Sequence, residues 1–233
     1  MGNRAAKAAL FEEFARVGKA LANGKRLELL DLLAQGERSV EALAAAAGLG
    51  LSTASAHLQT LRQAGLVTTR REGTKIYYDT AGDDVMRLFE LVRSVAQERV
   101  PAVENRRVAY LRLDGPRAEQ EELTRDELAA RAAEGRVTIL DVRPTDEYVA
   151  GHIPGALSIP LDELEARVHE LPAGGEVVAY CRGAYCVMAY DALDILRAQG
   201  LKARRLEEGM LEWRLAGLPV TPPAETVGTG SRR

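Results

Sequence analysis

Hydrophobic residues recur at helical spacing after Asn23 and predict three short helices in close succession. The apolar positions form three groups: Leu27, Leu29, Leu30, Leu32 and Leu33; Val40, Leu43, Ala44 and Ala47; Leu58 and Leu61. Asn23, Ser39 and Ser52 stand where helix N-caps are needed, and Gly48 and Gly65 stand where helices stop. The turn at residues 48–50 therefore separates the second helix from the third.

Beyond Gly65 the pattern changes from helical to extended. Residues 66–78 predict a strand, a turn and a second strand, which together make a hairpin. Three cations lie near the tip of this hairpin: Arg70, Arg71 and Lys75. A charged hairpin directly after three helices is therefore expected at the end of the first domain.

The second half of the chain alternates between helical and strand patterns. Residues 114–122 are polar and punctuated by Gly and Pro, which predicts a linker. Thr124 and Glu127 then form a capping box, with Leu123 and Leu128 as its hydrophobic staple. Short apolar β runs follow at residues 137–142, 176–180 and 203–206. This order predicts an α/β domain with a mostly parallel sheet.

Length and composition fit two compact domains. The chain has 233 residues, of which 46% are hydrophobic, and its net charge is −3. Residues 1–110 hold 16 Lys and Arg against 13 Asp and Glu, a balance of +3, which leaves 15 − 21 = −6 for the rest. Such asymmetry is expected when only one domain meets nucleic acid. We expect a cytoplasmic protein, because the sequence has no apolar membrane span and no export signal.

The two cysteines, Cys181 and Cys186, bound one short loop. The apolar strand at residues 176–180 delivers Cys181 to this Gly-containing loop, and a helical pattern begins beyond it. Unpaired N–H groups and the helix dipole should lower the pKa of Cys181 and make it a nucleophile. In a reducing cytoplasm, two such close cysteines are expected to be reactive rather than a structural clip.

Residues 5–105 resemble the ArsR-type winged helix-turn-helix of bacterial repressors, most clearly from Lys25 through Tyr78. The resemblance implies a homodimer held by helices at about residues 4–21 and 83–105, with residues 51–64 as the recognition helix. Wing cations Arg70, Arg71 and Lys75 would approach phosphates or the minor groove. The residues implied to face the major groove are Ser52, Thr53, Ser55, His57 and Gln59. For His57, exposure without base contact is an equal alternative.

Metal sensing is not expected of this domain, and no cofactor is expected for the chain. Metal-sensing members of the family carry a Cys-x-Cys pair before the recognition helix, where this chain has Ser39 and Glu41. The second site of the family needs His and Asp on the last helix, yet residues 83–105 contain no His. A generic three-helix domain with a charged hairpin is the alternative interpretation.

Residues 121–222 resemble a rhodanese in three segments: residues 140–156, the Cys181 loop and residues 208–213. The resemblance implies that Cys181 accepts sulfane sulfur as a persulfide. The N–H groups of the loop would cradle this sulfur, from Arg182, Gly183, Ala184, Tyr185, Cys186 and Val187. Four residues belong to the segment that stabilises the family fold, and a structural role is favoured for them over catalysis: Asp141, Arg143, Glu147 and His152.

Two positions after Cys181 limit the reactions that this loop is expected to support. Phosphatases and arsenate reductases with a similar loop need Arg six residues after the cysteine, where this chain has Val187. Many sulfurtransferases place Arg five residues after it, where this chain has Cys186, so Arg182 is the loop's one cation and thiosulfate turnover should be weak. Cys186 is either a resolving thiol that closes a disulfide or polysulfide with Cys181, or a packed bystander.

These observations predict a dimeric regulator, expected to be a repressor, which binds double-stranded operator DNA. Its rhodanese-like domain would sense a sulfane-sulfur donor or a small oxidant through Cys181, with Cys186 as partner. The alternatives are a sulfurtransferase that forms a Cys181 persulfide, with DNA binding for autoregulation or localisation, and a protein-binding module. The expected domains are residues 1–107 and 121–222, with a linker at 108–120 and a flexible tail at 223–233. No membrane partner is expected.

Overall fold

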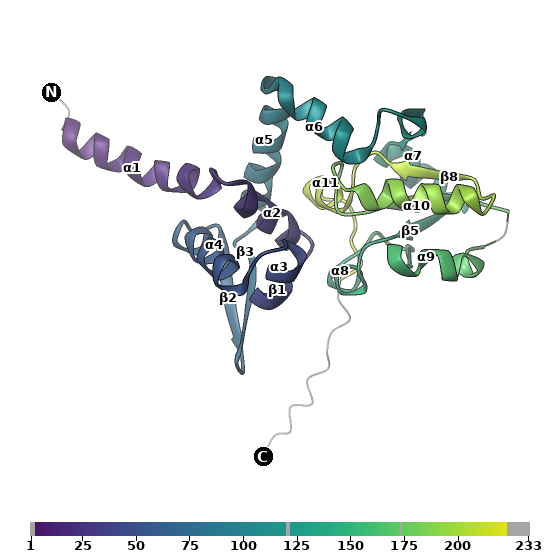
Figure 1. Cartoon of the computed structure of the whole chain (residues 1–233), viewed down its shortest axis with the longest axis horizontal. Coiled ribbons are helices and arrows are strands. Elements are labelled where there is room, and N and C mark those ends of the chain that lie inside the picture. The colour runs from purple at the N-terminus through teal and green to yellow at the C-terminus, as the bar shows by residue number, and fades with distance from the viewer. Residues whose placement is uncertain (1–2, 120–121, 173, 223–233) are drawn as a thin grey trace, which may run out of the picture. The chain divides into compact units, whose positions relative to one another are not determined.

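The computed structural model describes residues 3–119, 122–172 and 174–222 (Figure 1). The chain forms two compact units, Met1–Val103 and Glu104–Arg233. This confirms the predicted two-domain fold class, a winged helix-turn-helix followed by an α/β domain. None of the helices in the described ranges is long and apolar enough to cross a lipid bilayer. The predicted tail at residues 223–233 lies outside the described residues.

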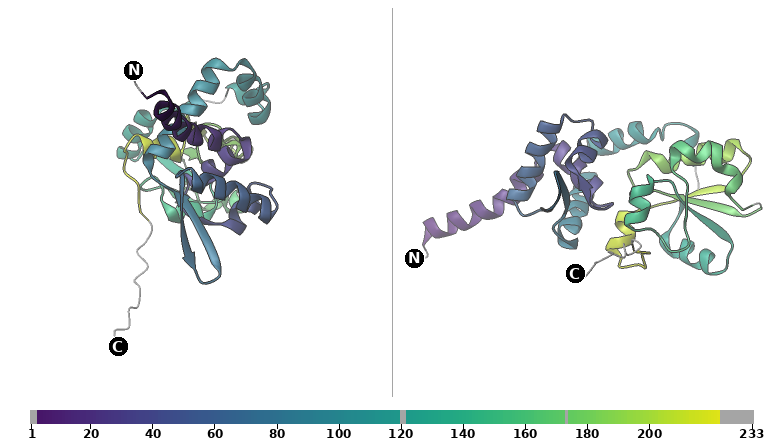
Figure 2. Two further views of the ribbon diagram at one scale, coloured as in Figure 1. Left: turned by 90° about the vertical axis from the view of Figure 1, so that its left-hand side faces the viewer. Right: turned by 90° about the horizontal axis from the view of Figure 1, so that it is seen from below.

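The first unit is helical with a small antiparallel sheet. Its strands lie in the order β1-β3-β2, and the β2–β3 hairpin extends away from the helices (Figure 2, left). Strand β1 was not predicted, because two residues are too few to show a period. The elements are α1 (Arg4–Leu21), α2 (Gly24–Leu33), β1 (Arg38–Ser39), α3 (Val40–Ala46), α4 (Leu51–Gln63), β2 (Val67–Glu72), β3 (Lys75–Thr80) and α5 (Asp83–Arg99).

Local capping explains where these helices begin. The side chain of Asn23 accepts the N–H groups of Lys25 and Arg26, and that of Ser39 accepts the N–H of Ala42, as predicted. Ser52 was a wrong choice of cap. Helix α4 begins at Leu51, after an extended Gly50 that takes the N-cap position, so Ser52 lies inside its first turn.

Proline divides the last helix of the first unit. One helix was expected over residues 83–105, but α5 ends at Arg99 and α6 runs from Pro101 to Leu111. Val100 between them is extended, with φ −113° and ψ 98°. Proline lacks the N–H that would continue the α5 ladder, and it forces the preceding residue out of the helical region. The boundary between the two units lies within α6, after Val103, so most of this helix belongs to the second unit.

The second unit is a five-stranded parallel sheet in the order β4-β8-β7-β5-β6. Strands β4 and β6 were not predicted, since each is only two residues long. The expected linker at residues 108–120 contains the end of α6 and a 3₁₀ turn, η1 (Pro116–Glu119). The remaining elements are β4 (Glu122–Leu123), α7 (Arg125–Ala133), β5 (Val137–Asp141), α8 (Thr145–Ala150), β6 (Leu157–Ser158), α9 (Leu161–Arg167), η2 (Val168–Glu170), β7 (Glu176–Tyr180), α10 (Val187–Ala198), β8 (Ala203–Leu206) and α11 (Met210–Leu215).

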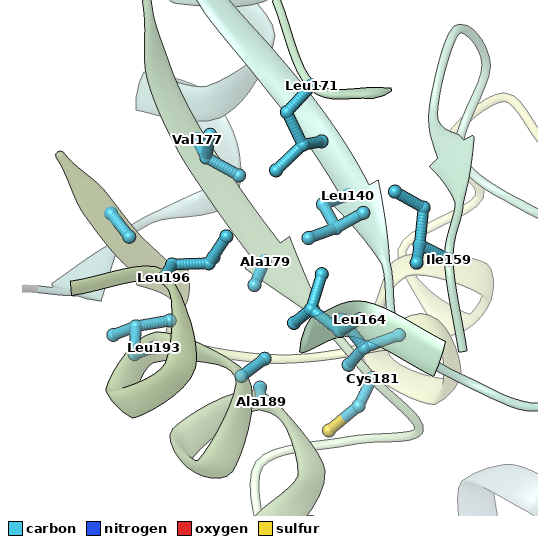
Figure 3. Close-up of a cluster of buried hydrophobic side chains, with 13 residues drawn as sticks. Leu140, Ile159, Leu164, Leu171, Val177, Ala179, Cys181, Ala189, Leu193 and Leu196 are labelled. Atoms are coloured by element: carbon cyan, nitrogen blue, oxygen red, sulfur yellow. The ribbon is translucent and has the colours of Figure 1, made fainter. Parts of the chain in front are cut away.

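Helices cover both faces of this sheet (Figure 2, right). Side chains alternate between the faces along a strand, so the central strand β7 contributes to two cores. Val177 and Ala179 pack with residues of α9 and α10 on one face, while Val178 and Tyr180 pack with residues of α7 and α11 on the other. The Cys181 side chain joins the first of these cores (Figure 3). The predicted capping box of Thr124 and Glu127 is present at the start of α7.

Candidate functional site

The Cys181 loop follows the central strand of the parallel sheet and ends where α10 begins. The start of α11 supports it: the N–H groups of Met210 and Leu211 donate to the carbonyls of Cys181 and Arg182, each at 3.0 Å. Gly209 allows this close approach. A Cβ atom at position 209 would lie 2.3 Å from the backbone nitrogen of Gly183.

The Cys181 thiol is buried, with 1% of the residue exposed. Its Sγ lies 3.5 Å from the carbonyl oxygen of Cys186 and 3.9 Å from that of Gly183, and its single S–H can donate to the nearer of these oxygens. Burial raises the pKa of Cys181 well above its usual value, and the neighbouring Cys186 side chain raises it further. The expected lowering of the Cys181 pKa is therefore wrong, because desolvation outweighs the N–H groups of Ala189 and Gly183.

Cys186 packs against the same core as Cys181 but is less buried. It is half-buried and occupies the N-cap position of α10, with its own N–H donated to the carbonyl of Gly183 at 3.0 Å. The neighbouring Cys181 side chain lowers the pKa of Cys186, and the N–H groups of Met188 and Arg182 and the Arg182 charge add to this effect. The two cysteines therefore influence each other within the loop, where the Cys181 Sγ lies 3.5 Å from the Cys186 carbonyl oxygen.

Arg182, the loop's one cation, is paired with a carboxylate of the fold. Its Nε and Nη2 donate to Glu147 Oε1 at 2.9 and 2.6 Å, and Nε is 3.1 Å from Oε2. The Glu147 side chain is 1% exposed. Charge pairing of this kind fixes the loop against α8 and leaves less positive charge for an anionic sulfur donor.

A buried polar network lies beside the loop at the end of β5. Arg143 donates through Nε and Nη2 to Asp141, at 3.0 and 2.6 Å, and through Nη2 to the Gly151 carbonyl at 2.9 Å. Both side chains are completely buried. The Tyr180 hydroxyl donates to Asp141 at 2.5 Å and accepts the N–H of Ile153 at 3.1 Å. This network joins the residue before Cys181 to the neighbouring strand.

His152 also makes contacts within the fold. Its ring stacks on that of Tyr148 with 3.7 Å between centroids, and its Nδ1 lies 2.9 Å from the Tyr148 carbonyl. The backbone of His152 bridges to Thr221. In the described ranges, no group of three His, Cys, Asp or Glu side chains could hold a metal ion.

Helix α4 places its predicted DNA-facing residues at different depths. Ala54, Leu58 and Leu61 form its buried face. Ser52 and Thr53 are exposed, whereas Ser55, His57 and Gln59 are half-buried. The Gln59 amide donates to the hydroxyl of Tyr78 at 3.2 Å, so it is oriented from within the fold.

The wing cations differ in how far they are already paired. Arg70 donates to Glu37 at 2.9 and 2.6 Å and to Glu72 at 2.7 Å, and it lies over the Tyr77 ring at 4.7 Å. Arg71 donates to the Gly73 carbonyl at 3.2 Å, and Lys75 is exposed. Of the three, Arg70 therefore has charge partners that compete with phosphate.

Comparison with known proteins relates both units to families. The arsR family of bacterial regulatory proteins matches residues 23–69, and the rhodanese-like domain family matches residues 124–216. The HTH-type transcriptional regulator Rv0324 of Mycobacterium tuberculosis (strain ATCC 25618 / H37Rv) is 57% identical over 224 residues, which is 96% of each chain. This chain belongs to the ArsR family and carries a rhodanese-like domain.

Two further proteins resemble one half each of this ArsR-family regulator. A sulfurtransferase of Allochromatium vinosum is 33% identical over 104 residues, which is 44% of this chain and 95% of that protein. The solution NMR structure of the homodimeric winged helix-turn-helix DNA-binding domain of Mb0332 from Mycobacterium bovis is 61% identical. It covers 44% of this chain and 93% of that one, with a TM-score of 0.40.

Sequence reasoning about this regulator missed the acidic partners of its arginines. Arg70 and Glu72 are two residues apart on one strand and so share a face, a signal that was present in the sequence. Glu37 comes from the segment before β1, and only the sheet order brings it to Arg70. The same holds for Glu147 and Arg182, which lie 35 residues apart in the chain.

Proposed function

We propose that this ArsR-family regulator is a repressor whose rhodanese-like domain senses sulfane sulfur at the Cys181–Cys186 pair. One observation carries the proposal: the two cysteines of the chain share one loop, and the Cys181 Sγ lies 3.5 Å from the backbone carbonyl oxygen of Cys186. Two thiols held in one short loop can exchange a persulfide for a disulfide. A sensor that controls DNA binding needs a reversible chemical change, and the exchange of a persulfide for a disulfide is such a change.

The sensing reaction needs no oxidant besides the sulfur donor. One protein thiolate attacks the outer sulfur of a hydropersulfide R–S–SH, forms a protein persulfide and releases R–S⁻. The second protein thiol loses its proton and attacks the inner, protein-bound sulfur, which forms the disulfide and releases HS⁻. In sum, R–S–SH and two protein thiols give R–SH, H₂S and one protein disulfide. Cellular thiols then reduce the disulfide and reset the sensor. A small oxidant would reach the same disulfide through a sulfenic acid.

The DNA-binding part of the proposal rests on α4 and the wing. We infer that Ser52, Thr53 and Ser55 meet base edges, together with Gln59 and His57, and that Arg71, Lys75 and Arg70 meet the phosphate backbone. Operator DNA lies in the cytoplasm, so the function requires that compartment.

A second copy of the chain is the inferred partner of the first unit. Two helices expose large apolar side chains: Leu10, Phe11 and Phe14 of α1 are each more than half exposed, as is Leu91 of α5. Apolar faces of this kind are expected to be covered in a soluble protein. We propose that α1 and α5 of two copies pack together and present the two α4 helices to successive major grooves.

The route from thiols to DNA is proposed to pass through α6. Arg117, beyond α6, donates to Asp191 and Asp194 of α10, each at 2.5 Å, and α10 begins directly after Cys186. Arg107 of α6 interacts electrostatically with Tyr185 of the loop. One residue separates α6 from α5. A disulfide in the Cys181 loop would therefore change the contacts that hold α6, the helix that leads into the first unit.

Fluorescence anisotropy tests this function with DNA from upstream of the protein's own gene. The reduced wild type, treated with polysulfide, should lose affinity by about 5- to 150-fold, the range of typical allosteric coupling. The Cys181→Ser and Cys186→Ser variants should keep their affinity, because neither can close the disulfide. Unchanged binding by a wild type whose disulfide has formed would overturn the sensor.

The second candidate is a sulfurtransferase, favoured by the likeness to the A. vinosum protein. Repeated turnover separates the two functions. An enzyme would pass many equivalents of sulfur from donor to acceptor through a Cys181 persulfide, whereas a sensor consumes one equivalent per reset. The Glu147–Arg182 pair argues against thiosulfate as an efficient donor, since it occupies the one cation of the loop.

A further inference from the structure

Gln59 lies on the side of α4 that is turned away from the core, yet its side chain is bonded to the fold. Ala54, Leu58 and Leu61 form the buried face of this helix. Gln59 comes seven residues after the exposed Ser52, and seven residues are nearly two turns, so these two side chains share one face. The proposed function places this face against the bases of the major groove.

The partner of Gln59 is a buried tyrosine. The Gln59 Nε2 donates to the Tyr78 hydroxyl at 3.2 Å. Tyr78 is 1% exposed and lies on β3, the central strand of the first sheet. It stands opposite Arg38 of β1 and Thr69 of β2, so the sheet holds its backbone on both sides. The fold therefore sets the position of the hydroxyl, and the hydroxyl sets the direction of the Gln59 amide.

This direction matters because the two ends of an amide have opposite hydrogen-bonding character. The carbonyl oxygen only accepts, and the NH₂ group only donates. A glutamine that turns freely about its last side-chain bond offers either end to a base. In Gln59 the nitrogen end is held by Tyr78, so the carbonyl oxygen is the end that remains for DNA.

Every base pair presents one amino group and one keto oxygen in the major groove. Adenine N6 and cytosine N4 donate hydrogen bonds, whereas thymine O4 and guanine O6 accept them. A carbonyl oxygen can bond to either amino group, but it meets the lone pairs of a keto oxygen with lone pairs of its own. An amide held in one direction therefore distinguishes adenine and cytosine from thymine and guanine.

We propose that Tyr78 is a specificity-determining residue, which holds Gln59 so that it selects adenine or cytosine at one position of each half-site. Tyr78 touches no base itself and acts by positioning Gln59. The inference deepens the proposed function and rests on its placement of α4 in the major groove.

Selection from a library of random double-stranded DNA tests the proposal with the reduced, full-length protein. Sequencing of the bound fraction gives the relative affinity for each base at each position of the site. Gln59→Ala identifies the position that Gln59 reads, because the base preference there is lost. At this position the wild type should prefer adenine or cytosine by at least about fivefold, the lower end of the range for a base contact.

Tyr78→Phe removes the hydroxyl and keeps the aromatic ring in the core. At the position that Gln59 reads, the preference should fall below about twofold, because the released amide can also donate to a keto oxygen. Preferences at the other positions should stay. Tyr77→Phe is the matched control, since this neighbouring ring lies on the other face of β3, with the Arg70 guanidinium 4.7 Å from its centroid. It should leave the preference unchanged.

Gln59→Glu provides a second variant, which keeps the length of the side chain and removes its donors. The Tyr78 hydroxyl can donate to one carboxylate oxygen, and the other oxygen still accepts from an amino group. The preference for adenine or cytosine should therefore persist, while affinity for all sequences falls because of the added negative charge. A merely structural bond between the two residues would instead leave every base preference of Tyr78→Phe as in the wild type.

Two results would overturn the proposal. One is a wild-type preference for thymine or guanine at the position that Gln59 reads, which means that the amide is turned the other way. The other is a preference that survives in Tyr78→Phe, once thermal melting followed by circular dichroism shows that this variant is folded. The wild-type preference and Gln59→Glu do not depend on the stability of Tyr78→Phe.

Failure of this inference differs from failure of the proposed function. If Gln59→Ala changes no base preference, Gln59 does not meet a base, and the inference and that part of the proposed DNA contact are both wrong. If Gln59→Ala removes the preference and Tyr78→Phe does not, the contact holds and the role of Tyr78 is wrong. All these measurements use reduced protein without polysulfide, so they do not depend on the sensor.

Discussion

Replacing Glu37 and Glu72 by glutamine tests whether the wing arginine meets DNA. Arg70 is held by both carboxylates, so the three side chains together carry 1 − 2 = −1 charge. The double variant leaves +1 and frees Arg70 for a phosphate. Each phosphate neutralised on duplex DNA adds about 0.9 to the slope of log affinity against log salt, hence about 1.8 for a dimer with two wings.

This slope sets the size of the expected effect. Raising salt fourfold, from about 50 to about 200 mM, should weaken the double variant about 12-fold more than the wild type, since four to the power 1.8 is about 12. Fluorescence anisotropy over a salt series measures both slopes. The contact is independent of base sequence, so the measurement does not depend on knowing the operator.

A matched control separates a contact from a general change of charge. Arg167 is held by Glu163 and Glu170 in the same way, but in the rhodanese-like unit. The Glu163→Gln, Glu170→Gln variant has the same change in net charge and should keep the wild-type slope. Equal slopes for all three proteins would refute the reasoning that Arg70 contacts phosphate, and equal steepening of both variants would assign the effect to net charge.

Three further changes probe the rhodanese-like unit. Asp141→Asn leaves the fully buried Arg143 without its carboxylate and should cost about 3–5 kcal/mol in the free energy of unfolding, followed by the single, buried Trp213; a cost below about 1 kcal/mol would contradict a buried ion pair. Gly209→Ala should displace the Cys181 loop and lower Tm by several degrees, whereas Gly175→Ala, with open space around its Cβ, should not. Arg117→Gln should leave disulfide formation intact but reduce the response of DNA binding to polysulfide; a full response would exclude this route.

Local signals predicted the elements that depend on neighbouring residues. The caps at Asn23 and Ser39 and the box of Thr124 and Glu127 need only three or four residues, and all three are present. Ser52 failed because Gly50 already adopts the extended cap conformation and starts α4 earlier. Strands β4 and β6 were missed because two residues of sheet have no period, and only pairing with β8 and β5 makes them strands.

The split between α5 and α6 was predictable but was overlooked. Pro101 stands in a segment with helical periodicity on both sides, and its effect on Val100 follows from covalent geometry alone. The ArsR resemblance implies one helix over residues 83–105, and that general pattern does not contain the break at Pro101. Where a general pattern and a proline disagree, the missing N–H of the proline decides the backbone.

The chemistry of the thiol loop shows what spacing can and cannot determine. A separation of five residues predicted that both cysteines share a loop, but not which sulfur is buried. Three long-range features decide this: the close approach of Gly209 to the backbone of Gly183, the Glu147–Arg182 ion pair, and the hydrophobic core that contains Ala179 and Ala189. They turn Cys181 inward toward carbonyl oxygens and leave Cys186 at the helix start. Desolvation and the loop N–H groups act on the pKa of Cys181 in opposite directions, and the loop sequence reveals only the second of these effects, because burial depends on the residues that the fold packs around the thiol.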